Sequence, residues 1–171
     1  MITKENIYKL LSEIPDPEIP VITIKDLGVL RDVIVNGNEV EIFITPTYSG
    51  CPAMKQIEDD IVSTLKKNGV EKVKLKTVFH PAWTTDWLTD EAKEKLRKYG
   101  IAPPVPLSLR RGVSPKGLSE ESSGLLRRGE VNCPHCGSEN TEMVSQFGST
   151  ACKALYKCLD CKEPFDYFKC H

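Results

Sequence analysis

Two Cys-x-x-Cys pairs near the carboxyl end constrain the fold of this chain more than any other feature. Cys133 and Cys136 form the first pair, and Cys158 and Cys161 repeat the spacing farther along. Four thiolates in this arrangement are the ligand set of a structural zinc site. A segment this short has little apolar core, so the bound metal would supply much of its folding free energy. The sequence therefore predicts a zinc ribbon over residues 131–171.

The chain holds seven cysteines, and six of them follow residue 130. Its first residues lack the charged and then apolar pattern of a secretory signal, and no apolar run is long enough to cross a bilayer. We therefore expect a cytoplasmic protein whose cysteines bind metal instead of forming disulfides. The 23 basic and 24 acidic residues leave a net charge of -1, which gives no support to a nucleic-acid or membrane partner.

Two cysteines of the carboxyl-terminal segment remain outside the four-thiolate set. Cys152 and Cys170 could form a second thiol site for a transient metal or cluster, or they could pack inside the ribbon as small apolar residues. His135 and His171 belong to the same segment, and we expect both to be exposed instead of bound to metal.

The amino-terminal half alternates helical and strand patterns. Apolar residues recur at helical spacing behind Thr3, the expected N-cap, and Asn36-Gly37 marks a two-residue hairpin. In order, the patterns predict a helix at 3–13, strands at 30–35 and 39–45, a helix at 51–65 and a strand at 73–79. This α-β-β-α-β order indicates an α+β sandwich with helices on one face of a small sheet.

Composition divides the chain into three parts. A charged helix is expected at 90–99, ended by Gly100. The next thirty or so residues show no helical or strand period and are rich in Pro, Gly, Ser and Arg, which is typical of a linker. We therefore expect an α+β domain at 1–102, a linker at 103–130 and the zinc ribbon at 131–171.

The stretch 45–52 joins the second predicted strand to the second predicted helix. Pro52 suits the first position of a helix, because that position needs no amide hydrogen. Cys51 would then be the N-cap, where unpaired backbone amides and the helix dipole lower a thiol pKa and favour the reactive thiolate. The alternative is a buried cysteine that packs as a small apolar residue. The residues alone leave these two interpretations evenly balanced.

A stiff segment, 15–20, carries two acidic residues among three prolines. Asp16 and Glu18 could bind a hard metal or attract a basic group of a partner. Turn termination and capping are nevertheless the roles that the residues alone favour. Trp83 and Trp87 are expected to close the core more than to line a site, because large aromatic side chains are usually buried.

Several stretches together resemble a known family. Residues 16–28 and 47–53 are similar to the two signatures of a family of small iron–sulfur and metal-cluster assembly proteins. One branch of that family, the PaaD proteins of the phenylacetyl-CoA epoxidase system, is similar to this chain at residues 81–88, 100–104, 147–156 and 163–170. The likeness extends over nearly the whole chain except the linker. His80 departs from the small polar residue expected at its position and is more easily explained as a structural or surface residue than as a ligand.

The resemblance implies a non-catalytic accessory role in aerobic phenylacetate degradation. The epoxidase is a multicomponent system with a di-iron oxygenase and an iron–sulfur reductase, and a protein of this branch is expected to help build or maintain those metal centres. The implied cofactors are zinc in the ribbon and a transient iron or iron–sulfur cluster at Cys51. The resemblance also makes Asp16 and Glu18 candidates for that site, and it makes the oxygenase and reductase subunits the expected partners.

Other functions stay open at this point. The ribbon could be a general docking module, or it could bind nucleic acid through Arg110, Arg111, Arg127 and Arg128, although the balanced charge argues against the second. A thiol enzyme that uses Cys51 is less favoured, because no histidine base can be placed beside it from the sequence. Small α+β modules with exposed strand edges commonly dimerise, so a homodimer is a further expectation.

Overall fold

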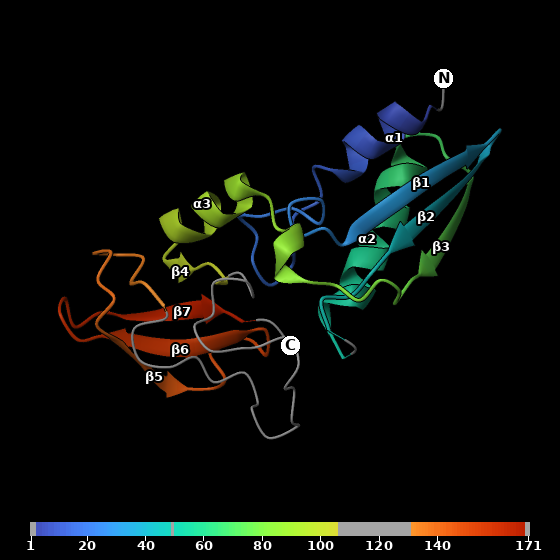
Figure 1. Cartoon of the computed structure of the whole chain (residues 1–171). Coiled ribbons are helices and arrows are strands. Elements are labelled where there is room, and N and C mark those ends of the chain that lie inside the picture. Colours follow the sequence, from blue (N-terminus) through green and yellow to red (C-terminus); the bar gives the residue numbers. More distant parts are fainter. Residues whose placement is uncertain (1–2, 49, 106–130, 170–171) are drawn as a thin grey trace. The chain divides into compact units, whose positions relative to one another are not determined.

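The computed structural model describes residues 3–48, 50–105 and 131–169 (Figure 1). The chain forms two compact units, Met1–Ala92 and Lys93–His171. Within the described residues, the first unit holds a three-stranded sheet and the second a four-stranded sheet.

The first unit has the α-β-β-α-β order that the sequence predicts. Its elements are α1 (Lys4–Leu11), β1 (Leu30–Asn36), β2 (Glu39–Ile44), α2 (Ala53–Lys67), β3 (Lys72–Thr77) and the 3-10 turn η1 (Thr85–Trp87). The sheet order is β1-β2-β3, with β1 and β2 antiparallel and β2 and β3 parallel. A tight hairpin joins the antiparallel pair, and α2 forms the crossover that a parallel pair requires.

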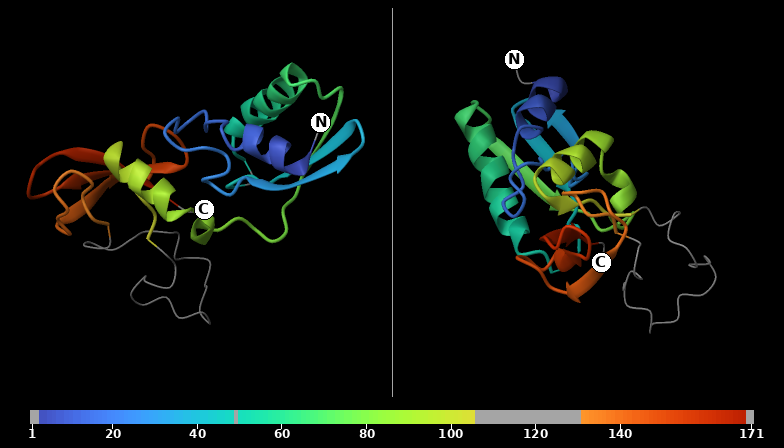
Figure 2. Two further views of the ribbon diagram at one scale, coloured as in Figure 1. Left: turned by 90° about the horizontal axis from the view of Figure 1, so that it is seen from above. Right: turned by 90° about the vertical axis from the view of Figure 1, so that its left-hand side faces the viewer.

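The core of the first unit lies between the sheet and its helices, which cover one face of the sheet (Figures 1 and 2). Helix α2 buries a stripe of residues one turn apart, and every second residue of β2 is buried. The facing residues are Ile57, Ile61 and Leu65 on α2 and Val40, Ile42 and Ile44 on β2. The predicted α+β fold class is therefore confirmed, with the core on the helix side of the sheet.

Helix α1 begins where the sequence predicts and ends two residues earlier. The Thr3 hydroxyl accepts a hydrogen bond from the backbone amide of Asn6 at 3.3 Å, which confirms the expected N-cap. At the other end, the amides of Glu13 and Ile14 donate to carbonyls three residues back, so the last turn tightens before Pro15.

The second unit contains a sheet in the order β4-β7-β6-β5. Its strands are β4 (Ile101–Ala102), β5 (Thr141–Ser145), β6 (Lys153–Cys158) and β7 (Pro164–Phe168). All neighbours are antiparallel except β4 and β7, which are parallel. Strands near 142–147 and 154–157 are predicted by the sequence, whereas β4 and β7 are too short or too irregular in pattern to be indicated by it.

A small cluster of aromatic and short side chains forms the core of the ribbon. Tyr156 stacks on Phe165 with ring centroids 5.9 Å apart and meets the edge of Tyr167 at 5.5 Å. The buried members of the cluster are Ala102, Val131, Cys133, Ala154, Tyr156, Cys158, Phe165 and Tyr167. Two zinc-ligand candidates are thus part of the core itself.

The three-part division into 1–102, 103–130 and 131–171 stays a prediction, because residues 106–130 lie outside the described residues. One detail differs from it. Ile101 and Ala102 pair with β7 and so belong to the second unit, and α3 (Asp90–Lys98) begins in the first unit and ends in the second. Arg110, Arg111, Arg127 and Arg128 fall in the undescribed segment. No helix in the described part of the chain is long and apolar enough to span a membrane.

Candidate functional site

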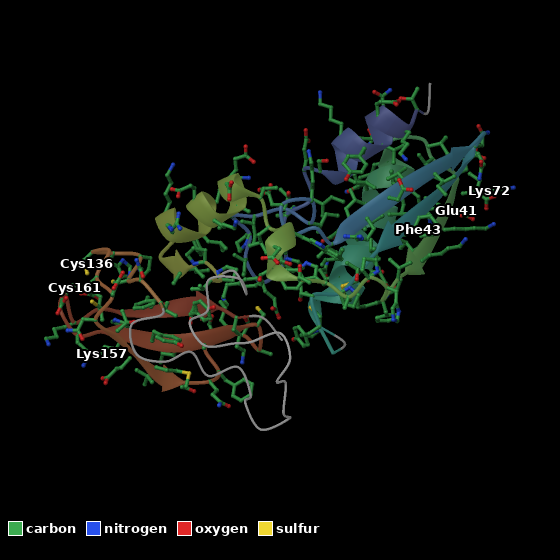
Figure 3. All side chains as sticks on the ribbon, in the orientation of Figure 1. Glu41, Phe43, Lys72, Cys136, Lys157 and Cys161 are labelled. Atoms are coloured by element: carbon green, nitrogen blue, oxygen red, sulfur yellow. The ribbon has the colours of Figure 1, made fainter. Side chains whose placement is uncertain are left out.

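The four cysteines of the two Cys-x-x-Cys pairs converge at one end of the ribbon. Their sulfur atoms all lie within 4.8 Å of one another, and Figure 3 shows Cys136 and Cys161 side by side at that end. The Cys133 and Cys161 sulfurs are 3.7 Å apart, and the Cys136 and Cys158 sulfurs are 3.6 Å apart. A tetrahedral zinc ion with Zn–S bonds of about 2.3 Å places its sulfurs about 3.8 Å apart. The donor set therefore fits zinc, and the predicted four-thiolate metal site is confirmed.

Backbone turns place the first pair around this site. Gly137 adopts a φ of +77°, which a residue with a side chain rarely takes, and its amide donates to the Cys133 carbonyl at 2.9 Å. The Cys133 amide in turn donates to the Ser138 carbonyl at 2.9 Å. The glycine that follows the first pair is therefore required by the turn that folds the chain around the metal.

An aspartate within the second pair ties the two metal-binding turns together. The side-chain amide of Asn140 donates to Asp160 at 2.8 Å, and the Ser138 hydroxyl donates to the other carboxylate oxygen. These hydrogen bonds lower the pKa of Asp160, so the carboxylate stays ionised. Sequence reasoning missed this contact; the polar residues directly after the first pair are the only signal of it.

The sulfurs of the ribbon influence one another strongly. Burial opposes ionisation of Cys158, but the backbone amides of Cys161 and Asp160 and the nearby sulfurs outweigh it and lower its pKa to about 6. The backbone amide of Glu163 favours the Cys161 thiolate, yet burial and the neighbouring sulfurs raise its pKa to about 12. Four thiolates cannot share so small a volume without a cation, and a bound zinc ion would supply that charge.

The second candidate centre is Cys51, which is half-buried in the first unit. Helix α2 begins at Ala53 with Pro52 as its N-cap, so Cys51 lies one residue outside the capping position that the sequence predicts. Burial raises the pKa of the Cys51 thiol, and the charges of Glu18 and Asp16 add to the rise. The backbone amide of Ala53 and the Thr47 hydroxyl act in the opposite direction but do not prevail.

The expectation of a lowered thiol pKa at Cys51 is therefore wrong in this structure, and the physical reason is tertiary. A helix N-terminus stabilises a thiolate within the first turn, whereas Cys51 stands outside that turn and partly out of water. Two acidic side chains from a distant segment of the chain make the thiolate still less favourable. The thiol is accordingly protonated at neutral pH, and a cation is what would reverse this.

Asp16 performs the turn-capping role that its sequence context favours. Its side chain is only 7% exposed, and one carboxylate oxygen accepts the amides of Glu18 at 2.9 Å and Ile19 at 2.8 Å. The Asp16 amide donates to the Ile22 carbonyl at 2.9 Å, which closes the proline-rich loop. This loop lies close enough to Cys51 for both carboxylates to influence its thiol. The structure thus brings Cys51, Asp16 and Glu18 into one neighbourhood.

The two tryptophans brace the same part of the first unit. Trp83 is buried, as the core interpretation predicts, and its ring nitrogen donates to the Leu27 carbonyl at 2.7 Å. The Arg31 guanidinium lies over the Trp87 ring at 3.7 Å. Gly28, at a φ of +71°, lies so close that an added Cβ would be 3.0 Å from the Trp87 Cβ. The tryptophans therefore hold the loop before β1 and do not line a pocket.

The proposed second thiol site stays a prediction. Cys152 is buried and its sulfur lies 3.0 Å from the Thr150 hydroxyl, but Cys170 and His171 lie outside the described residues. His80 and His135 are both exposed, and neither joins the four-cysteine group.

Comparisons with known proteins match both units of the chain. Residues 4–75 match the family described as iron-sulfur cluster assembly protein, and residues 119–169 match the PaaD zinc beta ribbon domain. A crystal structure of a domain of unknown function, DUF59, from Bacillus anthracis superposes with a TM-score of 0.51 and 30% identity, over 54% of this chain and 90% of that one.

Two relatives extend this result. The chain is 35% identical over 96 residues to an Fe-S protein maturation auxiliary factor of Porphyromonas gingivalis (strain ATCC BAA-308 / W83), covering 55% of this chain and 90% of the relative. It is 49% identical over 164 residues to the fourth-lettered (D) component of a 1,2-phenylacetyl-CoA epoxidase in Escherichia coli (strain K12), covering 96% of this chain and 91% of the relative.

The fold and the four-cysteine site define a protein that joins an iron–sulfur-assembly domain to a zinc ribbon. The similarity over almost the full length goes further: the chain belongs to the PaaD family of phenylacetyl-CoA epoxidase components.

Proposed function

We propose that this chain is a non-catalytic accessory factor that holds iron or an iron–sulfur cluster at Cys51 and delivers it to the metal centres of a phenylacetyl-CoA epoxidase. The observation that carries the proposal is the convergence of the half-buried Cys51 thiol with the carboxylates of Asp16 and Glu18. The relationship to Fe-S protein maturation auxiliary factors supports it. The oxygenase and reductase components of the epoxidase are the partners, and the zinc ribbon is the platform that docks them.

The chemistry of the Cys51 neighbourhood suits a transient cargo. A soft sulfur next to hard carboxylate oxygens can bind iron, and a thiolate forms as the metal displaces the thiol proton. One sulfur and two carboxylates do not complete a closed ligand shell, so the cargo keeps a position for a ligand of the recipient. The ribbon has the opposite property, because its four sulfurs saturate the metal.

Maturation of the epoxidase in cells tests the proposal. Epoxidase components would be co-expressed with the native chain, with Cys51→Ser, or with Lys55→Gln, a control on the exposed face of α2 whose side chain is 77% exposed. We expect Cys51→Ser to leave the fold intact and to abolish the gain in iron content and epoxidase activity, while Lys55→Gln retains both. Full metallation of the epoxidase in the presence of Cys51→Ser would contradict the delivery role.

Metal analysis of the protein purified without oxygen gives a direct measurement. We expect about one zinc per chain from the ribbon, together with a labile iron-dependent absorption after reconstitution. That absorption should disappear in Cys51→Ser, whereas the zinc content should not change. If the absorption persists in this variant, the cargo is held elsewhere and only a docking role remains.

A further inference from the structure

Strand β3 forms one edge of the first sheet (Figure 1). Among the described residues it pairs with β2 alone, so the backbone groups on its outer side are not engaged by another strand. An edge of this kind can accept an added strand, and its side chains decide which strands fit.

The side chains of β3 alternate between two chemistries. Lys72, Lys74 and Lys76 occupy one face, where all three are exposed, and Val73 and Leu75 occupy the other, where both are half-buried. Because the faces of a strand alternate, an added strand that matches β3 needs acidic residues on the first face and apolar residues on the second.

The inner neighbour of β3 already has that pattern. Strand β2 reads Glu-Val-Glu-Ile from Glu39, and its two glutamates pair with lysines of β3. Lys74 lies 2.7 Å from Glu39, and Lys76 lies 3.0 Å from Glu41; Figure 3 shows Glu41 on β2 beside Lys72 on β3. Both paired lysines are more than half exposed, and Lys72 makes no ion pair among the described residues, so the row can meet acidic groups from its outer side as well.

The same pattern disfavours a second copy of β3 at this edge. Two β3 strands paired with each other would bring lysine next to lysine across the new ladder, which is destabilising. The edge is therefore protected against self-association through this strand while it remains complementary to an acidic one.

The carboxyl end of β3 lies close to the end of β2 that leads to Cys51. The Val78 amide donates to the Ile44 carbonyl at 2.8 Å, and residues 45–52 follow directly after Ile44. Phe79, which is 57% exposed, comes next to Val78. A strand added to β3 would thus end at the edge of the sheet from which the Cys51 loop departs.

We propose that the outer edge of β3 binds an extended segment of a partner protein in which acidic and apolar residues alternate. Such a segment adds a fourth strand, with its acidic residues over the lysine row and its apolar residues beside Val73 and Leu75. The biological use, docking of a recipient close to Cys51, rests on the proposed function; the binding itself does not.

Fluorescence anisotropy with the zinc-loaded full chain tests the proposal. The probe is a fluorescein-labelled peptide with the sequence of residues 38–45, because this is the strand pattern that β3 accepts on its inner side. We expect saturable binding that weakens as salt is added. A peptide carrying Glu39→Lys and Glu41→Lys, and an acidic peptide N-methylated at alternate residues, should each bind about tenfold more weakly or less.

A matched pair of variants locates the site. The triple variant Lys72→Gln, Lys74→Gln, Lys76→Gln should weaken peptide binding about tenfold. The control Lys55→Gln, Lys66→Gln, Lys67→Gln removes the same charge from α2 and should bind like the native chain. Circular dichroism shows whether both variants fold, and protection of β3 amides from exchange upon peptide addition provides a readout independent of substitution.

The outcomes separate the two proposals. If the acidic peptide does not bind, if the N-methylated peptide binds equally well, or if the α2 control loses binding to the same extent, the edge proposal is wrong. If Cys51→Ser fails to affect epoxidase maturation while peptide binding at β3 persists, the delivery role fails and the edge proposal stands.

Discussion

The two units of this chain are stabilised in different ways. In the first, long aliphatic side chains such as Ile42, Ile61 and Leu65 are completely buried between sheet and helix. In the ribbon, the buried cluster consists of three aromatic rings with alanines, one valine and two of the metal-ligand cysteines. The first unit therefore gains its stability from apolar burial, whereas the second shares this task with a metal.

The cysteines of the two units differ in the same sense. In the ribbon four sulfurs surround one point, and the pKa of Cys158 falls to about 6. In the first unit a single sulfur stands beside carboxylates, and the pKa of Cys51 is raised. A closed set of sulfurs retains its metal, whereas an open and protonated thiol favours exchange. The comparison teaches that one chain can combine a permanent and a transient metal site by changing the number of sulfurs.

Removal of zinc should have the largest effect and should be confined to the ribbon. A strong chelator, or Cys158→Ser, is expected to unfold the second unit, because its core includes the ligands. Both tryptophans of the chain, Trp83 and Trp87, belong to the first unit. Their fluorescence should stay native while the near-ultraviolet circular dichroism of the tyrosines declines. Simultaneous loss of both signals would show that the units do not fold independently.

A cavity in the first core should have the next largest effect, with the opposite distribution. Leu65→Ala removes a completely buried side chain and should lower the free energy of unfolding of the first unit by about 2–5 kcal/mol. Urea denaturation followed by tryptophan fluorescence measures this change, and zinc content should be unaltered. Lys66→Ala, at an exposed neighbour, is the control and should change the unfolding free energy by no more than about 0.5 kcal/mol.

The alkylation of Cys51 should depend on pH in a way that distinguishes it from an ordinary thiol. Burial and the charges of Glu18 and Asp16 raise its pKa, so the thiolate fraction at neutral pH is small. Iodoacetamide labelling of the zinc-loaded protein, followed by mass spectrometry, should accelerate with an inflection above that of a reference cysteine peptide. Glu18→Gln removes one negative charge and should move the inflection down. An inflection below that of the peptide would contradict the structure.

The aspartate that links the metal-binding turns should have the smallest effect. Asp160→Asn keeps the size of the side chain but weakens its hydrogen bonds to Ser138 and Asn140. We expect zinc transfer to a chromogenic chelator to become about tenfold faster, since groups behind the ligands orient them. Asp59→Asn, on the exposed surface of α2, is the control. Equal transfer rates for both variants would show that this clamp does not support the metal.

The element order and the zinc ligands could be predicted because they depend on local patterns. Helical spacing and strand alternation extend over neighbouring residues, and the two Cys-x-x-Cys pairs contain their own turns. The short strands β4 and β7 could not be predicted in this way. Ile101–Ala102 is a strand only because β7 lies beside it, and β7 belongs to a part of the chain far away in sequence.

The state of the candidate site depended on contacts that no local pattern contains. The sequence predicts a helix cap and a lowered pKa for Cys51, and it leaves Asp16 between turn-capping and metal binding. The structure shifts the start of α2 by one residue, buries part of the thiol and brings two carboxylates from the proline-rich loop towards it. Each of these changes acts on charge, which responds to burial and to groups distant along the chain.

By itself, then, the sequence determined the α+β order of the first unit, the four zinc ligands and the resemblance to the PaaD family. Only the tertiary structure decided that Cys51 is a protonated, half-buried thiol, that Asp16 caps a turn beside it and that β3 presents a basic edge. The physical reason is that periodicity and spacing are written in neighbouring residues, whereas burial, electrostatic environment and strand edges exist only when distant segments meet.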